Sequence, residues 1–144
     1  MADNSLVPRI AAIYELQAAL LSPELQRIGI SFGTFQLLAA ISGSKNGASQ
    51  AEIARRLGIS PATLSESVRS HVTRELIEQV ESLTDRRVKL LKLTPTAAKN
   101  LKSVKDVLEE IERKILKDVK KGELKTCCET LDNAIIRMQR LLEK

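Results

Sequence analysis

Apolar side chains recur every three or four residues along both ends of this chain, which is the period of an amphipathic helix. One such helix is predicted from about residue 6 to residue 21. Beyond residue 94 the spacing continues in two heptad-like helices, joined by a Lys-Lys-Gly-Glu turn in which Gly122 interrupts the helical pattern. The apolar positions of the three segments are Ile10, Ile13, Leu16 and Leu20, then Ala97, Leu101, Val104, Leu108, Ile111 and Ile115, and finally Leu124, Cys128, Leu131, Ile135, Met138 and Leu142.

The middle of the chain predicts two short helices joined by a tight turn. Ser49 and Glu52 have the spacing of a capping box, in which the serine side chain caps the helix that follows. Gly58 is expected to end that helix, since glycine adopts positive φ at little cost. Ser60 then caps a second helix, predicted from Pro61 to Arg74 because proline favours the first helical position. Such a pair of crossed helices is a helix-turn-helix.

A β-hairpin is predicted directly after these helices. Residues 76–80 and 88–93 are short branched and aliphatic runs, and the polar stretch between them suits a hairpin tip. Thr84 and Asp85 favour a turn, from which Arg86 and Arg87 would project. The predicted fold is therefore mainly α with a small β wing (α+β), a winged helix-turn-helix over residues 31–94 flanked by terminal helices.

The outward face of the second helix favours double-stranded DNA as a partner. It carries small, hydroxyl and charged side chains without bulky apolar groups, which suits a major groove, while the hairpin arginines suit phosphates or a narrow minor groove. Asp85 is placed to orient one arginine. The alternative is a solvated helix face with an exposed ion pair of little energetic value. The candidate DNA-binding residues are Ser60, Pro61, Ala62, Thr63, Ser65, Glu66, Arg69, Arg74, Asp85, Arg86 and Arg87.

The chain resembles the multiple-antibiotic-resistance regulator (MarR) family of bacterial transcription factors. Asp85-x-Arg87, followed after five residues by Leu93-Thr94, is similar to the wing signature of that family, and it follows the segment 52–60 at a family-like distance. The resemblance implies a homodimeric winged helix repressor with an effector pocket between its DNA-binding and dimerisation regions. Glu75 departs from the family pattern, which usually has glycine after the recognition helix.

The terminal helices are predicted to form a homodimer. A single winged helix unit is too small to cover the apolar faces of three long helices, so residues 1–30 and 95–144 are expected to pair across a two-fold axis within one domain, 1–144. Two recognition helices about 34 Å apart would then require a pseudopalindromic operator. The alternative is a monomeric helical bundle.

Composition narrows the class of function. The formal net charge of +5 favours a polyanionic partner, whereas three aromatic residues offer few stacking platforms for single-stranded nucleic acid. His71 is the sole histidine, and no phosphate-binding loop or nucleophile set accompanies it, so an enzyme is not expected. The spacing of the cysteines favours no metal site, no cofactor is implied, and the lack of an apolar span or signal sequence predicts a cytoplasmic protein without a membrane partner.

Two possible triggers and one rival function remain open. A small-molecule effector is expected near Tyr14, Phe32 and Phe35, at the junction of the winged region and the terminal helices. Cys127 and Cys128 raise the possibility of redox sensing, although Cys128 lies on the apolar seam and is expected to be a small buried hydrophobe. The rival function is a winged helix protein-interaction module with weak or no DNA binding.

Overall fold

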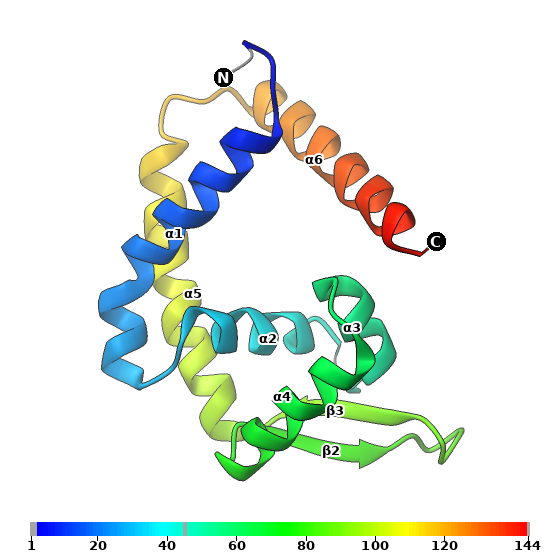
Figure 1. The fold of residues 1–144 in the computed structure, drawn as a ribbon. Coiled ribbons are helices and arrows are strands. Elements are labelled where there is room, and N and C mark those ends of the chain that lie inside the picture. Colours follow the sequence, from blue (N-terminus) through cyan, green and yellow to red (C-terminus); the bar gives the residue numbers. More distant parts are fainter. Residues whose placement is uncertain (1–2, 45, 144) are drawn as a thin grey trace.

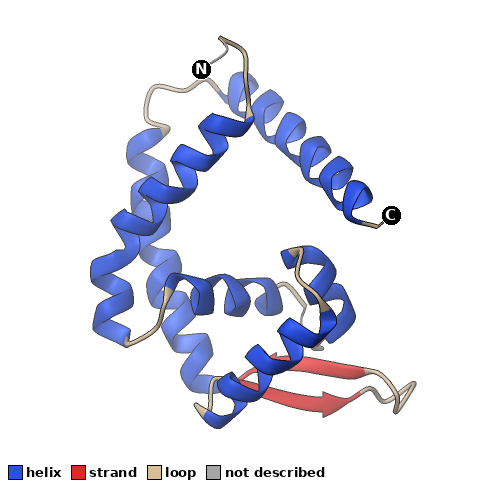
Figure 2. Cartoon of the chain, viewed as in Figure 1, coloured by secondary structure: helices blue, strands red, loops and turns tan. Residues whose placement is uncertain are grey.

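The protein combines six helices with one small sheet, as the computed structural model of residues 3–44 and 46–143 describes it (Figure 1). Helices carry most of these described residues, and the strands are confined to one end of the molecule (Figure 2). The predicted class, mainly α with a small β wing, is confirmed. The elements are α1 (Val7–Ile28), α2 (Phe32–Ser42), β1 (Ala48–Ser49), α3 (Gln50–Leu57), α4 (Pro61–Thr73), β2 (Ile77–Glu81), β3 (Lys89–Leu93), α5 (Pro95–Ile115) and α6 (Lys121–Leu142).

The sheet is antiparallel, with β3 in the centre between β1 and β2. In the hairpin Ile77 pairs with Leu93 and Glu81 pairs with Lys89. The short strand β1 adds the pair Ala48 with Leu91, which the sequence analysis did not predict because two residues are too few for a periodic pattern. Because α3 begins directly after this third strand, the pairing of β1 with β3 connects the start of α3 to the wing.

The core joins α2, the first half of α5 and the winged elements. Its fully buried side chains include Leu38 and Ile41 from α2, Leu64 from α4, Leu91 from β3 and Val104 from α5. Burying an aliphatic side chain of this size contributes about 1.5–3 kcal/mol. The winged region is therefore packed directly on α5.

The two caps predicted at Ser49 and Ser60 are present in the structure, and Thr94 forms a third. The side chain of Ser49 accepts a hydrogen bond from the backbone N–H of Glu52, and the side chain of Ser60 accepts one from Thr63. Thr94 caps α5 in the same way, since its Oγ1 accepts a hydrogen bond of 3.1 Å from the N–H of Ala97. These bonds satisfy amides that a helix start leaves unpaired.

Helix α1 continues past its predicted end at Leu21 and reaches Ile28, with Pro23 inside it. A proline in a helix interior costs about 3 kcal/mol. Leu21 and Leu25, one on each side of the proline, are 0% and 5% exposed, and the burial of both outweighs that cost. Gly29, with φ of 72°, then ends the helix.

The break between the two C-terminal helices was predicted at the wrong residue. Helix α5 ends at Ile115, and α6 begins at Lys121, so Gly122 lies in the first turn of α6. Glycine is tolerated in a first turn, where the backbone amides have no partner within the helix. The chain turns earlier because Val119 N donates back to Leu116 O after α5 has ended.

Helix α6 begins near the N-terminal end of α1, faces α1 across an opening and runs back toward α3 (Figure 1). Within the described residues α6 contributes no buried side chain. Its C-terminal end approaches α3, where an ion pair of 3.9 Å joins Arg55 and Glu143. Most of the apolar seam predicted for this helix is therefore uncovered in a single chain.

Glu75 has a left-handed backbone, with φ of 58°, at the turn that follows α4. A side chain in this region is strained by about 1–2 kcal/mol, whereas glycine is not. We expect Glu75→Gly to raise the free energy of unfolding by about 0.5–1 kcal/mol, after allowing for the greater freedom of glycine in the unfolded chain. Thermal denaturation should show a gain of about 2–4 °C.

The matched control is Glu78→Gly, an exposed position in β2 that glycine should destabilise. Equal or lower stability for Glu75→Gly would contradict the strain argument.

Glu24 connects α1 to α5. It accepts hydrogen bonds from Arg27 on its own helix and from the hydroxyl of Ser103 on α5. These contacts, with that of Arg27 the stronger, lower the pKa of Glu24 from 4.5 to about 2. A carboxylate with a lowered pKa stabilises the fold above its unfolded pKa and loses that contribution as the pH falls through the folded value.

We therefore expect Glu24→Gln to flatten the pH dependence of stability between about pH 5 and pH 2. Chemical denaturation across this range should show the wild type losing stability more steeply than the variant. Arg27→Gln should flatten the curve similarly, since it removes the main cause of the shift. Parallel curves for all three proteins would exclude this role of Glu24.

Candidate nucleic-acid interface

Helix α4 is held with one face outward by the turn that precedes it. Gly58, with φ of 67°, closes α3, and the αL conformation lets the chain reverse within a few residues. Leu64 and Val68 are 0% and 2% exposed and fix the inner face of α4 in the core. The opposite face, which carries Ala62, Thr63, Glu66 and Arg69, is exposed.

A buried histidine anchors the second half of α4 to α2. His71 is 8% exposed, and its Nε2 lies 2.9 Å from the hydroxyl oxygen of Thr34. Its Nδ1 lies 2.6 Å from the carbonyl oxygen of Ser67, so Nδ1–H donates there and Nε2 accepts from Thr34. The side chain is thus a structural link behind the exposed face of α4.

The tip of the wing holds an oriented arginine. Asp85 accepts the backbone N–H of Arg87 at 3.0 Å and two guanidinium hydrogen bonds at 3.2 and 3.3 Å. The side-chain and backbone hydrogen bonds from Arg87 lower the pKa of Asp85, because they stabilise its ionised form. The Arg87 side chain is still 91% exposed, so its charge remains accessible to a partner.

A groove separates α4 from the wing. Among its lining residues are Gln50, Ser65, Arg87 and Lys89. Gln50 Nε2 donates to Ser65 Oγ at 2.9 Å, and Gln79 Nε2 donates to Gln50 Oε1 at the same distance. This chain of hydrogen bonds fixes the wing relative to α4.

Three residues at this groove were missed in the sequence analysis. Gln50 and Lys89 line it, and Gln79 bonds to Gln50. Lys89 comes two residues after Arg87, where the hairpin tip passes into β3, and this position would have identified it as a further cation of the wing. Gln50 and Gln79 carry no such signal, because their contact depends on how the strands pair.

Several predicted DNA-binding residues have local structural roles. Ser60 caps α4, Pro61 occupies its first turn, and Ser65 bonds to Gln50. Arg74, at the end of α4, donates from Nη2 to the carbonyl oxygen of Gly29 at 3.2 Å, so its guanidinium lies toward the turn between α1 and α2. Arg69 and Arg86 are exposed, as is Arg87.

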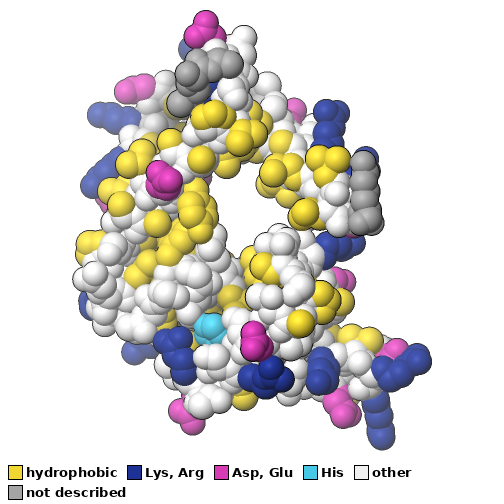
Figure 3. Space-filling view, in the orientation of Figure 1, with side chains coloured by type: hydrophobic (Ala, Val, Ile, Leu, Met, Phe, Trp, Pro, Cys, Tyr) yellow, Lys and Arg dark blue, Asp and Glu magenta, His cyan; other side chains and the backbone are white. Residues whose placement is uncertain are grey.

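Basic side chains gather along the end of the molecule that contains α4 and the wing (Figure 3). Acidic side chains are interleaved with them, including Glu66 on α4 and Glu81 at the end of β2. The surface is thus mixed in charge, with its cations concentrated at exposed positions that a polyanion can reach.

The three aromatic residues meet where α1 joins α2. The rings of Tyr14 and Phe32 pack edge to face at 5.2 Å, and those of Phe32 and Phe35 lie 6.0 Å apart. Phe35 is only 6% exposed and belongs to the core. A cavity of about 430 Å³ beside Tyr14 is lined also by Gln36 of α2, Leu57 of α3 and residues of α4.

Cys127 and Cys128 are both exposed on the first half of α6. The expectation of a buried Cys128 does not hold in the single chain, because α6 packs against no core that would cover its apolar seam. In the part of the chain that the structure describes, no three His, Cys, Asp or Glu side chains form a group that would hold a metal.

No described helix has the length and apolar character that crossing a membrane requires. The fold and the exposed α4 and wing define the chain as a winged helix protein with long terminal helices.

Comparison with known proteins shows what the chain is similar to. Residues 28–88 match the model of the MarR family. The structure is also similar to CouR from Rhodococcus jostii bound to p-coumaroyl-CoA, with a TM-score of 0.76, 16% identity and coverage of 88% of each chain. It is similar to MepR of S. aureus in a DNA complex, with a TM-score of 0.74 and 18% identity over 94% of this chain and 99% of that one.

A further match is a MarR variant from E. coli complexed with operator DNA, with a TM-score of 0.70 and 19% identity over 90% of this chain and 92% of the other. Identities this low establish the fold. The region that matches the family model covers the helix-turn-helix, β2 and the tip of the wing, and it ends before β3. The chain therefore has the fold of these winged helix proteins, and its segment 28–88 is similar to the MarR family.

Proposed function

We propose that two copies of this chain form a homodimer that binds a pseudopalindromic DNA operator and represses transcription. In this proposal α4 of each copy enters a major groove, and the wing contacts the flanking minor groove or its phosphates. The observation that supports this proposal most is that the exposed face of α4 and the exposed, oriented side chain of Arg87 lie on either side of one groove.

The contacts on this face divide into two kinds. Thr63, Glu66 and Arg69 lie on α4, where they would meet base edges, while Arg86, Arg87 and Lys89 on the wing would meet phosphates. Phosphate contacts set the affinity and its dependence on salt, whereas base contacts set the sequence preference. Both kinds arise from elements that the core and the Gln50 hydrogen bonds hold in place.

The uncovered apolar surface supports the dimer. A groove between α1 and α5 is lined by Ile13, Leu16 and Leu20 on one side and by Leu108, Ile111 and Ile115 on the other. On α6, Ile135, Met138 and Leu142 are 53–67% exposed. Figure 3 shows hydrophobic side chains on the facing parts of α1 and α6. Exposed apolar surface on this scale indicates a partner, and a second copy offers the complementary helices.

Release by a small-molecule effector is the regulatory part of the proposal. The cavity beside Tyr14 lies between α1 of the terminal region and α3 and α4 of the winged region. A ligand there would change the angle between them and move the two α4 helices out of register with the DNA. Since coupling between sites is reciprocal, DNA should weaken effector binding by the same factor. A bacterial repressor of this kind acts in the cytoplasm, where its operator lies.

One observation favours the rival function of a protein-interaction module. Leu83, at the tip of the wing, is fully exposed, and Glu78 and Glu81 lie on the same hairpin. A protein interface would depend on such apolar contacts and respond little to salt.

Fluorescence anisotropy with labelled promoter DNA from around the gene distinguishes the two functions. A regulator should protect one pseudopalindromic segment and bind it with an affinity that falls steeply as salt rises. Arg87→Ala should reduce the slope of log affinity against log salt by about two for a dimer, one contact for each copy. No binding to any promoter segment at low salt would favour the interaction module.

A further inference from the structure

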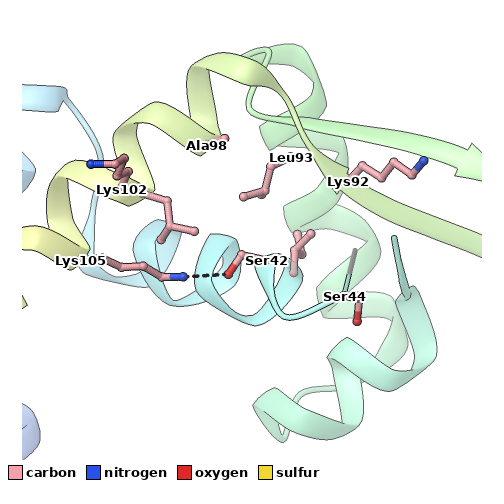
Figure 4. Close-up of a pocket in the computed structure, with 9 residues that line it drawn as sticks. Ser42, Ser44, Lys92, Leu93, Ala98, Lys102 and Lys105 are labelled. Carbon is pink, nitrogen blue, oxygen red and sulfur yellow. Dashed lines mark hydrogen bonds between the residues drawn. The ribbon is translucent and has the colours of Figure 1, made fainter. Parts of the chain in front are cut away.

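A second cavity, of about 510 Å³, lies between α2, the first half of α5 and β3 (Figure 4). It is separate from the cavity beside Tyr14, with which it shares no lining residue. Ile41 and Leu101, which are 1% and 3% exposed, belong to its apolar part together with Leu93 and Ala98. The polar part consists of Ser42, Ser44, Lys92, Lys102 and Lys105.

The charged side chains among the described lining residues of this cavity are all positive. Three lysines from two elements surround it, and no carboxylate is among its described lining residues. Lys105 turns inward, since its Nζ lies 3.3 Å from the hydroxyl oxygen of Ser42. Lys92 and Lys102 lie at opposite sides of the cavity (Figure 4). Three like charges gathered around a concave surface favour an anion.

The lysines are able to converge on a ligand. The Nζ of Lys102 lies 3.4 Å from Oδ2 of Asp106, but both side chains are well exposed, and such a pair contributes little. Replacing the contact of Lys102 with Asp106 by a contact with a bound anion therefore costs little free energy. Each lysine carries its charge on a flexible four-carbon stem, so the amines of Lys92 and Lys102 can swing inward without backbone movement.

We propose that this cavity binds a phosphate monoester of a small apolar alcohol. A phosphate monoester carries about −1.5 to −2 charges and three acceptor oxygens, which matches three ammonium groups and two hydroxyls. A monocarboxylate offers one charge and would leave part of this donor set unused. Leu93 and Ala98, the more accessible aliphatic residues of the lining, provide apolar surface for the organic group of the ester.

The position of the cavity links the ligand to the wing. Lys92 belongs to β3 of the wing, whereas Lys102 and Lys105 belong to α5, which leads to the dimer helices. An anion held by both would favour one angle between these elements. This consequence for DNA rests on the proposed function, whereas binding itself does not.

Titration of the intact protein with phenyl phosphate, followed by NMR of the backbone amides, tests the binding step without DNA. We expect saturable shifts at Ser42, Ser44 and Lys92, and weaker binding of benzoate and inorganic phosphate. Lys102→Gln combined with Lys105→Gln should weaken phenyl phosphate by about tenfold or more. The control is Lys99→Gln with Lys117→Gln, which removes equal charge from α5 and the turn after it outside the cavity.

Equal weakening in both double variants, or no saturable shift with phenyl phosphate, would overturn the site. A second experiment measures operator binding in the presence of the ester. Phenyl phosphate should change the DNA affinity of the wild type and not that of the Lys102/Lys105 variant. If that variant lost DNA affinity in the absence of any ester, the lysines would be holding DNA phosphates, and the proposal would be wrong.

Discussion

Replacement of Arg69 and Arg87 by alanine is expected to weaken operator binding on the order of a thousandfold. A dimer loses four guanidinium groups in this variant, two from α4 and two from the wing. Each contributes about 1–3 kcal/mol when it contacts a base or a phosphate, so even the low end of this range gives the stated loss. The measurement is fluorescence anisotropy with operator DNA at one fixed salt concentration.

The fold should survive these changes because both side chains are exposed. Arg113→Ala with Lys117→Ala is the matched control, since it removes two cations at the end of α5 remote from the winged region. This control should keep the wild-type affinity to within a few fold, with the small loss that a lower net charge brings. A similar large loss in both variants would mean that charge alone, rather than the α4 and wing surface, governs binding.

Replacement of Leu16 and Leu20 by glutamate is expected to separate the dimer and weaken operator binding on the order of a hundredfold or more. These side chains on α1 are 63% and 55% exposed in the single chain, so the change should leave its fold intact. Buried in a dimer, two carboxylates per copy would be costly. Affinity then falls because a lone half-site contact loses the gain of linked binding, commonly 10²–10⁴.

Circular dichroism should show unchanged helicity, while sedimentation should show a single chain. Leu83→Glu is the control for the oligomeric state, because it places a charge at an exposed leucine on the wing, far from α1, and should leave the dimer intact. A double variant that stays dimeric would place the interface elsewhere. A monomer that binds the operator with full affinity would show that two linked α4 helices are not required for binding.

Local signals in the sequence were enough to predict the winged elements. The caps at Ser49 and Ser60 and the αL glycine at Gly58 each depend on a few neighbouring residues. The hairpin and its Asp85 to Arg87 contact are similarly local. Such features depend on interactions between residues that are close in the sequence, so the sequence alone indicates them.

Features that depend on tertiary contacts were not predictable. Helix α1 was predicted to end at about residue 21, and only the burial of Leu21 and Leu25 explains why it continues through Pro23 to Ile28. Arg74 was expected to face DNA, whereas its guanidinium contacts Gly29, a residue 45 positions away. The Gln50 network and the lysine cavity likewise join side chains that are distant in the sequence.

The uneven burial along α5 could not be predicted from the sequence either. One heptad-like run covers Ala97 to Ile115, but Ala97, Leu101 and Val104 are buried in their own chain, while Ile115 is 67% exposed. Periodicity identifies an apolar face without telling which neighbour covers it. The structure divides this face into an intramolecular half and a half that we assign to the second copy.

Sedimentation velocity at micromolar concentration, with and without a labelled operator duplex, tests the central claim most directly. We predict a dimer in the absence of DNA and a complex of two chains on one duplex in its presence, with no comparable complex on a scrambled duplex. A single chain that sediments alone and leaves the operator unbound at low salt would contradict the account.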